Sequence, residues 1–403
     1  MYLANGRYAV LDLSSGDVEE HELPEAYALN PRGVMAVIDS AVSDAGSVGI
    51  AISSGVLTGS LVPASCAGFI RFPSSGSENM RTCPLTGFMG VELKLTGFDF
   101  VVITGQAVQD GYAWIRDGIC EFVPSPGIRE LNSWERTDKI RSDQGDGKIQ
   151  VIAGGPWGQH GIATSQLTMN YWGGEDMVGA AAEFGRIGLS AVAFRGMGEL
   201  ELHDAEGHLS RSSSLMRSQL VSLGTNDGLA SFSETAARDD FRKLLHRNVG
   251  CYACPFPCRS YYKVHEEPSV MTLDNREPGC LVQDVPSVEM MASLGMSAME
   301  TIESLILCAR YGAEPMASVS ALQAREGKVD IAALEAMLMS LDSPEPWVGS
   351  TKGGFRESFD DHRDYELCLS LGLCPRYWAR VGFDRDSIRS VAGPAMGAEI
   401  DLG

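Results

Sequence analysis

Three cysteines lie close together in Cys251-Tyr-Ala-Cys254-Pro-Phe-Pro-Cys258, with the spacing C-x2-C-x3-C. Two prolines stiffen the loop because each fixes its own backbone φ angle. A cubane iron–sulfur cluster needs four thiolates that converge on one point, and a short loop of this kind can supply three of them. The stretch therefore predicts a metal site around which the rest of the chain has to fold.

The fourth ligand has to come from elsewhere in the chain. The best candidate is Cys374, which is followed by Pro375, because a cysteine next to proline is common at such sites. Cys368 lies shortly before it and Cys280 lies near the triplet, so either could substitute. The cysteines outside the predicted site are expected to be small buried apolar residues: Cys66, Cys83, Cys120, Cys280, Cys308 and Cys368.

Three kinds of metal site compete for the triplet. A zinc ribbon usually shows paired C-x2-C knuckles, and here there is no second pair. The radical-SAM motif runs in the opposite order, C-x3-C-x2-C, and leaves one iron open. A four-thiolate [4Fe-4S] centre fits the spacing best, with iron bound by Cys251, Cys254, Cys258 and Cys374.

Length and charge limit the functions that are open to the chain. With 403 residues it can form two or three domains. A net charge of −21 disfavours nucleic acid and anionic membrane surfaces, and suits a basic partner or a permanent complex. We find no apolar run long enough for a membrane span and no signal peptide, so we expect a cytoplasmic protein.

The first half of the chain has the pattern of a β-rich domain with short helices. Apolar or alternating runs bounded by turn residues predict strands at 7–13, 48–53, 100–104, 112–116, 150–153 and 189–194. Helical spacing predicts helices near 32–43 and 133–142.

The second half changes to helical periodicity. Apolar residues recur at helical spacing over 212–223, 233–245, 288–311, 318–326 and 331–341. A loop is predicted at 342–354. We expect an α+β fold, with a β-rich domain over 1–205 and a mainly helical domain over 206–403 that carries the cluster cysteines.

Further segments occur in an order that is informative. They are the opening 6–17, the run 50–59, the segments 83–87 and 90–99, the cysteine loop with the basic residues before it, and 371–374. In this order they resemble the tungsten-containing aldehyde ferredoxin oxidoreductase family. The resemblance covers residues 1–310, closed by 371–374. It implies that family's β-rich N-terminal fold, and it makes Cys374 the fourth cluster cysteine.

The family holds tungsten between two pterin dithiolenes beside its cluster, and the matching segments are altered here. Its Gly-Gly-Arg corresponds to Ala64-Ser-Cys66-Ala67-Gly68, and Arg71 comes later. Its loop before "ELK" is replaced by 83–86 or deleted. A family loop rich in arginine and glycine corresponds to residues 171–179 here. In this segment Glu175 and Asp176 would repel an anionic ligand. Binding of tungstopterin is therefore doubtful.

Other family features are missing from the second half. The segment between Cys258 and Cys374 is short, and the family's Gly-His-Gly element is absent. The family's acidic "GPEYE" segment corresponds to residues 279–284 here. The proposed active-site glutamate of that segment is therefore lost or has become Gln283 or Asp284. The chain is interpreted as a truncated, divergent member of the family.

The leading hypothesis is an electron-transfer or scaffold subunit of a larger oxidoreductase complex, with one [4Fe-4S] cluster and a lost tungstopterin site. Its partners would be other redox subunits or a ferredoxin-like carrier, and it could form oligomers. The alternative is a compact tungstopterin enzyme that oxidises an aldehyde to a carboxylic acid and passes electrons through the cluster to ferredoxin. Its candidate polar groups would be His160, Asp284 and Glu289. A third hypothesis is a non-redox interaction protein with a structural metal.

Overall fold

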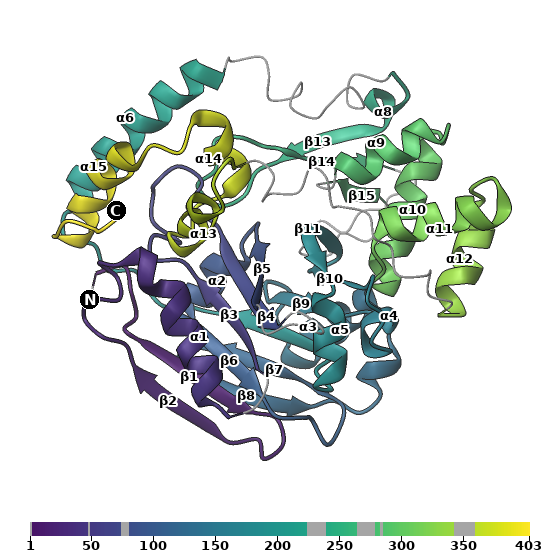
Figure 1. Cartoon of the computed structure of the whole chain (residues 1–403), viewed down its shortest axis with the longest axis horizontal. Helices are drawn as coiled ribbons and strands as arrows, with labels where there is room; N and C mark the ends of the chain where they lie inside the picture. The colour runs from purple at the N-terminus through teal and green to yellow at the C-terminus, as the bar shows by residue number, and fades with distance from the viewer. Residues whose placement is uncertain are drawn as a thin grey trace.

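A computed structural model describes residues 2–46, 49–73, 80–223, 239–263, 279–282, 285–341 and 359–403. Figure 1 shows β-sheets built from the first half of the chain, with helices of the second half gathered at two places beside them. The predicted α+β class, with a β-rich N-terminal part and a mainly helical C-terminal region, is confirmed.

The first sheet has the strand order β2-β1-β6-β3-β4-β5 within the described residues. Its strands are β1 (Arg7–Asp12), β2 (Val18–Glu22), β3 (Ile50–Ser54), β4 (Gly68–Pro73), β5 (Met80–Leu85) and β6 (Phe100–Thr104). β1 and β6 run parallel, and the other neighbours are antiparallel. β5 lies at an edge, where Pro84 is tolerated because an edge residue does not need its N–H in the ladder.

The second sheet has the order β11-β10-β9-β12-β7-β8 in the same described ranges. Its strands are β7 (Gly111–Arg116), β8 (Ile119–Pro124), β9 (Gln150–Ala153), β10 (Gln166–Met169), β11 (Trp172–Val178) and β12 (Ala191–Arg195). Short helices α2 (Met89–Leu95), α3 (Ser133–Gln144), α4 (Pro156–Gln159) and α5 (Ala180–Arg186) connect or flank these strands.

The two sheets share a hydrophobic core, and β6 shows how its sequence is used. Its side chains alternate between two faces, as in any strand. Val101 and Ile103 pack in the core that also contains Ile115 of the second sheet. Phe100 and Val102 pack on the opposite face of the first sheet. A continuous apolar run is thus needed because both faces of the strand are buried.

The outer face of the first sheet is covered by elements from both ends of the chain. α1 (Val34–Asp44) packs there together with α13 (His362–Ser370), α14 (Pro375–Val381) and α15 (Arg385–Met396). Figure 1 shows these C-terminal helices on the left, close to the N-terminus. The proposed division at residues 205 and 206 stays a prediction, and one hydrophobic core contains both Phe100 and Trp378.

The remaining helices form a second group, seen at the right of Figure 1. They are α9 (Val285–Ser293), α10 (Ala298–Tyr311), α11 (Pro315–Glu326) and α12 (Ile331–Met339). The predicted helix over 288–311 is wrong in one respect, because it is broken between α9 and α10. Ser297 begins α10 through a capping box with Glu300, and the φ of Gly295 is +80°.

A three-stranded sheet lies between the two helical groups. Its strands are β13 (Leu245–Val249), β14 (Arg259–Lys263) and β15 (Gly279–Val282), and it follows α6 (Ala205–Leu223) and α8 (Asp239–Leu244). The helix predicted over 233–245 is found only as α8, and part of that range lies outside the described residues. The predicted loop at 342–354 also lies outside them.

Candidate functional site: five cysteines at the junction of three segments

The three cysteines of the triplet lie in the connection of a β-hairpin. β13 and β14 are antiparallel and pair up to the residues that flank the loop. Within the loop the amide of Cys254 donates to the carbonyl of Cys251 at 3.2 Å, and the amide of Cys258 donates to the carbonyl of Phe256 at 2.8 Å. The hairpin fixes both ends of the loop, and these turns hold its thiols close together.

The triplet loop contacts the connection between β3 and β4 through two unusual residues. Ala253 has a φ of 48° and Ala64 has a φ of 58°, and the amide of Ala64 donates to the carbonyl of Ala253 at 3.0 Å. A left-handed backbone costs a non-glycine residue roughly 1–2 kcal/mol. Such strain persists only where the surroundings hold it, and it gathers at functional sites.

Residues that follow β5 also hold the triplet loop. The amide of Tyr252 donates to the carbonyl of Gly87, which follows β5, at 3.3 Å, and its hydroxyl donates to the carbonyl of Gly59, which lies between β3 and β4, at 3.0 Å. The amide of Gly87 donates to the sulfur of Cys251 at 3.3 Å. A hydrogen bond to sulfur favours the thiolate, so this contact prepares Cys251 to bind a cation.

Cys374 reaches the same place from the C-terminal part of the chain. It stands directly before α14, and its amide donates to the carbonyl of Ala64 at 2.9 Å. Its side chain does not cap the helix. Ala64 therefore bonds to the triplet loop through its N–H and to Cys374 through its carbonyl, which joins three distant segments at one residue.

A close approach of two backbones positions the turn before Cys374. The amide of Leu57 donates to the carbonyl of Leu371 at 2.8 Å, and the amide of Ala67 donates to the carbonyl of Gly372 at 2.9 Å. A Cβ atom added to Gly55 would overlap the backbone nitrogen of Gly372, and a Cβ atom on Gly372 would overlap the hydroxyl of Thr58. Glycine is required at both positions because no side chain fits between the segments.

The structure brings all four predicted ligands together, and Cys66 joins them as a fifth thiol. Hydrogen bonding to Cys251 and Cys374, burial, and the negative charge of the same two groups raise the pKa of Cys66 well above the ordinary value. Burial, followed by the charges of Cys251 and Cys374, also raises the pKa of Cys254 and of Cys258. The five sulfurs therefore lie within electrostatic reach of one another.

Cys251 differs from its neighbours because its pKa is lowered, to about 6. The hydrogen bond with Cys66 is the largest cause; the charge of Arg259 and the amide of Gly87 act in the same direction and outweigh the effect of burial. Burial lowers the pKa of Arg259, but the charges of Cys251, Cys258 and other thiols raise it further. The site thus contains a stable positive charge beside its sulfurs.

Arg259 has one nitrogen that the surrounding protein does not satisfy. Its Nη2 donates to the carbonyl of Gly250 at 2.8 Å. Its Nε is buried and has no hydrogen-bond partner among the described residues. Leaving a buried donor unpaired is unfavourable by about 1–3 kcal/mol, more for a charged group, so an anionic group beside it would be stabilised.

The role of Cys66 was missed at the level of the sequence, where we predicted only a small buried residue. It is buried, with 0% exposure, but it lies at the cysteine site. One signal could have found it. In the family resemblance, Cys66 falls in the segment that corresponds to the cofactor-contacting Gly-Gly-Arg.

The alternative fourth ligands have other surroundings. Cys368 is fully buried near Cys374, but its S–H donates to the carbonyl of Leu373 at 3.4 Å. The side chain of Cys280 lies outside the described residues. Cys83, Cys120 and Cys308 are buried in hydrophobic clusters, as predicted.

Across the described ranges, no group of three or more His, Cys, Asp or Glu side chains is arranged so that it could hold a metal ion. The cysteine site is therefore characterised by its hydrogen bonds and charges, and the assignment of a metal to it stays a prediction.

The charged residues of the "ELK" segment, Glu92 and Lys94, form ion pairs and hydrogen bonds within the protein. Lys94 Nζ contacts Asp99 Oδ1 at 2.6 Å, and both side chains have 0% exposure. Glu92 Oε1 accepts hydrogen bonds from Arg195 Nη1 at 3.1 Å and from the Gly196 amide at 2.9 Å. These charged groups stabilise the junction of α2 with its neighbouring strands.

Arg71 is also bound within the protein. Its guanidinium forms an ion pair with Asp39 and donates to Thr82 Oγ1 at 2.7 Å, and Glu366 lies 3.9 Å away. The side chains of Glu175 and Asp176, in β11, lie outside the described residues.

The polar candidates for the alternative enzyme do not join the cysteines in the described structure. His160 is exposed after α4, and its Nδ1 lies 2.8 Å from the carbonyl of Pro156. Glu289 is exposed on α9. Asp284 and Gln283 lie outside the described residues.

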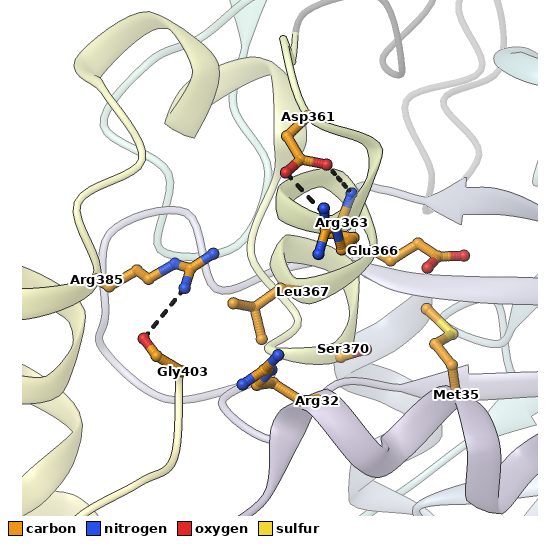
Figure 2. Close-up of a pocket in the computed structure, with 9 residues that line it drawn as sticks. All are labelled: Arg32, Met35, Asp361, Arg363, Glu366, Leu367, Ser370, Arg385 and Gly403. Carbon is orange, nitrogen blue, oxygen red and sulfur yellow. Dashed lines mark hydrogen bonds and ion pairs between the residues drawn. The ribbon is translucent and has the colours of Figure 1, made fainter.

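A pocket of about 380 Å³ is lined by residues of α13, the helix that leads to Cys374, together with residues near α1, α15 and the end of the chain (Figure 2). Charges of both signs line it. Arg363 pairs with Asp361 at 3.7 Å, and Arg385 donates to the carbonyl of Gly403 at 3.2 Å. Arg363 and Arg385 thus have partners within the chain, and we assign no ligand to the pocket.

Comparison with known proteins identifies the first part of the chain. Residues 8–196 match the family model described as "Aldehyde ferredoxin oxidoreductase, N-terminal domain". The chain is 25% identical over 308 residues to the tungsten-containing aldehyde ferredoxin oxidoreductase of Pyrococcus furiosus, and 24% identical over 308 residues to that of Thermococcus kodakarensis. Each match covers 64% of this chain and 49% of the relative.

The fold has a solved counterpart. A chain of the active-site complex BamBC of benzoyl-coenzyme A reductase, in complex with 1,5-dienoyl-CoA, matches with a TM-score of 0.65 at 14% identity. The match covers 99% of this chain and 66% of that chain. The described residues contain no helix that is long and apolar enough to cross a membrane. The chain spans about half the length of the curated relatives it matches, and its residues 8–196 match the N-terminal domain of the aldehyde ferredoxin oxidoreductase family.

Proposed function

We propose that this chain is an iron–sulfur redox protein with one [4Fe-4S] cluster, bound by Cys251, Cys254, Cys258 and Cys374. It would act as an electron-transfer or scaffold subunit of a larger oxidoreductase complex. The observation that carries the proposal is the double hydrogen bonding of Ala64, which ties the triplet loop and the Cys374 turn to one place.

The donor set fits such a cluster. Thiolates are its usual ligands, and hydrogen bonds and nearby charge adjust its potential. The chain would contribute the amide of Gly87, which donates to Cys251, and the guanidinium of Arg259, whose unpartnered Nε would gain an anionic neighbour. When bound, the cluster would supply one-electron transfer.

We propose further that the tungstopterin site is lost. Lys94, in the segment that resembles the family's "ELK" motif, is engaged with Asp99, and Arg71, which follows the segment that corresponds to its Gly-Gly-Arg, is engaged with Asp39. A pterin phosphate would have to compete with these internal carboxylates. A role inside a complex is supported by the fold shared with a chain of the BamBC complex.

Metal analysis tests the proposal. Protein purified without oxygen should contain about four iron and four sulfide per chain and no tungsten or molybdenum. The double variant Cys251→Ala/Cys254→Ala should lose nearly all of its iron. Cys308→Ala, which removes a thiol buried in the helical core, should keep it. Full iron in the double variant would refute the ligand assignment.

A second function is favoured by the names of the relatives, which are tungsten-containing aldehyde ferredoxin oxidoreductases. In that case the chain would be a compact tungstopterin enzyme that oxidises an aldehyde to an acid and passes electrons through the cluster to ferredoxin. Stoichiometric tungsten together with aldehyde-dependent dye reduction would establish it and would end the proposal of a lost site.

A further inference from the structure

We propose that the exposed side of the triplet loop, together with Leu61, Phe88 and Arg380, is the docking surface for an acidic one-electron carrier protein. The inference rests on the proposed function, because this carrier would be the redox partner of the cluster that the loop helps to bind. Binding of a carrier and the metal content of the chain are measured separately, so the two proposals fail on different results.

Two exposed apolar side chains lie on segments that contact Tyr252, the residue after Cys251. Phe88 is 48% exposed, and its ring meets that of Tyr252 edge to face with the centroids 6.4 Å apart. Leu61 is 41% exposed and lies two residues after Gly59, whose carbonyl accepts the hydrogen bond of the Tyr252 hydroxyl. Single exposed apolar residues are normal, but two beside one partly exposed tyrosine give the apolar centre that protein interfaces have.

Phe88 also stands close to a ligand sulfur. It follows Gly87, whose amide donates to Cys251 Sγ at 3.3 Å. The three cysteines of the triplet are themselves only partly buried. A protein that packs on Phe88 would therefore lie directly beside the proposed ligands.

Basic side chains flank the same loop. The guanidinium of Arg380, an exposed residue of α14, lies over the ring of Phe256 at 5.1 Å from the centroid, and this cation–π contact holds the charge beside the loop. Arg259 directly follows the loop, and a Cβ atom added to Gly87 would lie 3.3 Å from its Nη1. Positive charge thus adjoins the loop both at α14 and at the turn that precedes Phe88.

The segments that build this surface contain no Asp or Glu. They are residues 55–67, 80–91, 241–263 and 371–383. The whole chain, by contrast, has 53 Asp and Glu against 32 Lys and Arg. At about 0.1 M salt, exposed charges more than about 10 Å apart are largely screened, so the basic residues at the loop act on a docked partner more strongly than the distant acids do. Net charge alone suits a basic partner, whereas this face suits an acidic one.

The test uses two carrier proteins of opposite charge, an acidic flavodoxin and the basic cytochrome c, in titration calorimetry at about 0.1 M salt. The flavodoxin should bind, and higher salt should weaken its binding because ion pairs across the interface are screened. Any binding of cytochrome c should occur elsewhere on the acidic chain, so variants of the docking surface should leave it unchanged.

Variants locate the flavodoxin on the chain. Arg380→Glu should weaken its binding at least about tenfold, because like charges would then face each other. Phe88→Ala should weaken it about tenfold, as the loss of a central aromatic contact does. Arg116→Glu, at the exposed end of β7, and Val108→Ala, at a side chain that is 80% exposed, are the matched controls and should bind as the natural protein does. All four variants should keep about four iron.

Arg380→Gln, which removes the charge without reversing it, serves if the glutamate variant does not fold. Absence of flavodoxin binding would overturn the inference and leave the proposed cluster intact. So would equal affinity in the surface variants and their controls, or a cytochrome c affinity that the surface variants abolish. Absence of iron from the natural protein would instead refute the proposed function, and the inference with it.

Discussion

At the residue scale, Lys94 and Asp99 form an ion pair without any solvent exposure. Replacing Lys94 by Met would leave the carboxylate buried and unpaired, so we expect the free energy of unfolding to fall by about 3–5 kcal/mol. Urea denaturation measures the change. Adding Asp99→Asn should recover much of it, because Asn removes the charge and can still accept the hydrogen bond from the Gly6 amide.

The exposed pair of Lys139 and Asp143, in α3, gives the control. Its atoms lie 2.9 Å apart, but the lysine side chain is 33% exposed. Lys139→Met should lower the stability by only about 0.3–0.5 kcal/mol. A similar loss for both lysine variants would show that burial does not determine the strength of the first pair.

The cysteines show what sequence alone can predict at this scale. Spacing identified the triplet, because three thiols in a short loop satisfy a local requirement. Cys374 was the best candidate for the fourth ligand from its sequence context, but the resemblance to a family was needed to prefer it over Cys368 and Cys280, because the partners of this ligand are distant in the chain. Cys66 was not singled out, since its position at the site depends on backbone hydrogen bonds of Ala64 and Ala67 that only the folded chain brings together.

At the scale of elements, the turn between α13 and α14 depends on Gly372. Its φ is +78°, and a Cβ atom would overlap Thr58. We therefore expect Gly372→Ala to displace the turn and to lower the iron content of the purified protein. Gly382 also has a positive φ, +87°, but a Cβ atom added there would meet no other atom within 4 Å. Gly382→Ala should keep its iron, and equal losses would argue against the steric explanation.

The start of α15 makes a pH-dependent contribution. Asp384 accepts hydrogen bonds from the amides of Asp386 and Ser387, and its hydrogen bond with the Ser387 side chain is the largest cause of a lowered pKa. At pH 7, Asp384→Ala should destabilise the protein by about 0.5–2 kcal/mol.

A lowered pKa in the folded state fixes the sign of this effect. The charge-dependent part of the stabilisation is present above the unfolded pKa of about 3.9 and is lost as the pH falls through the folded value. The difference between the natural protein and Asp384→Ala should therefore shrink below about pH 4. Asp384→Asn, which still caps the helix, should stay stable at pH 7 and lack this dependence. A constant difference from pH 7 to pH 3 would contradict the assignment.

Helices and strands were predictable where a single hydrophobic periodicity dominated the segment. Residues 100–104 and 150–153 form strands as expected, since their apolar runs are buried on both faces. The break between α9 and α10 was missed because the apolar residues continue through it, while the capping residues Ser297 and Glu300 decide where the second helix starts. β13 and β14 were missed because their polar residues show no strict alternation.

At the scale of the whole molecule, a bound cluster would tie residues 251–258 to residue 374 and would stabilise the fold. Anything that binds only the native state raises its stability. We expect removal of iron by a chelator under oxidant-free conditions to lower the melting temperature of the natural protein. Calorimetry before and after chelation measures this. The Cys251→Ala/Cys254→Ala variant should melt at one temperature regardless of chelator, and an equal shift in both proteins would refute the link.

The junction at Ala64 has a consequence for biosynthesis. A ribosome finishes the first sheet and then the hairpin long before it reaches α14. During that interval the thiols at 251, 254 and 258 leave the exit tunnel without the neighbour that later covers them. A cluster that needs Cys374 would therefore be completed only after residue 374 has been synthesised, and a nascent chain that stalls before it would present sulfhydryls open to oxidative damage.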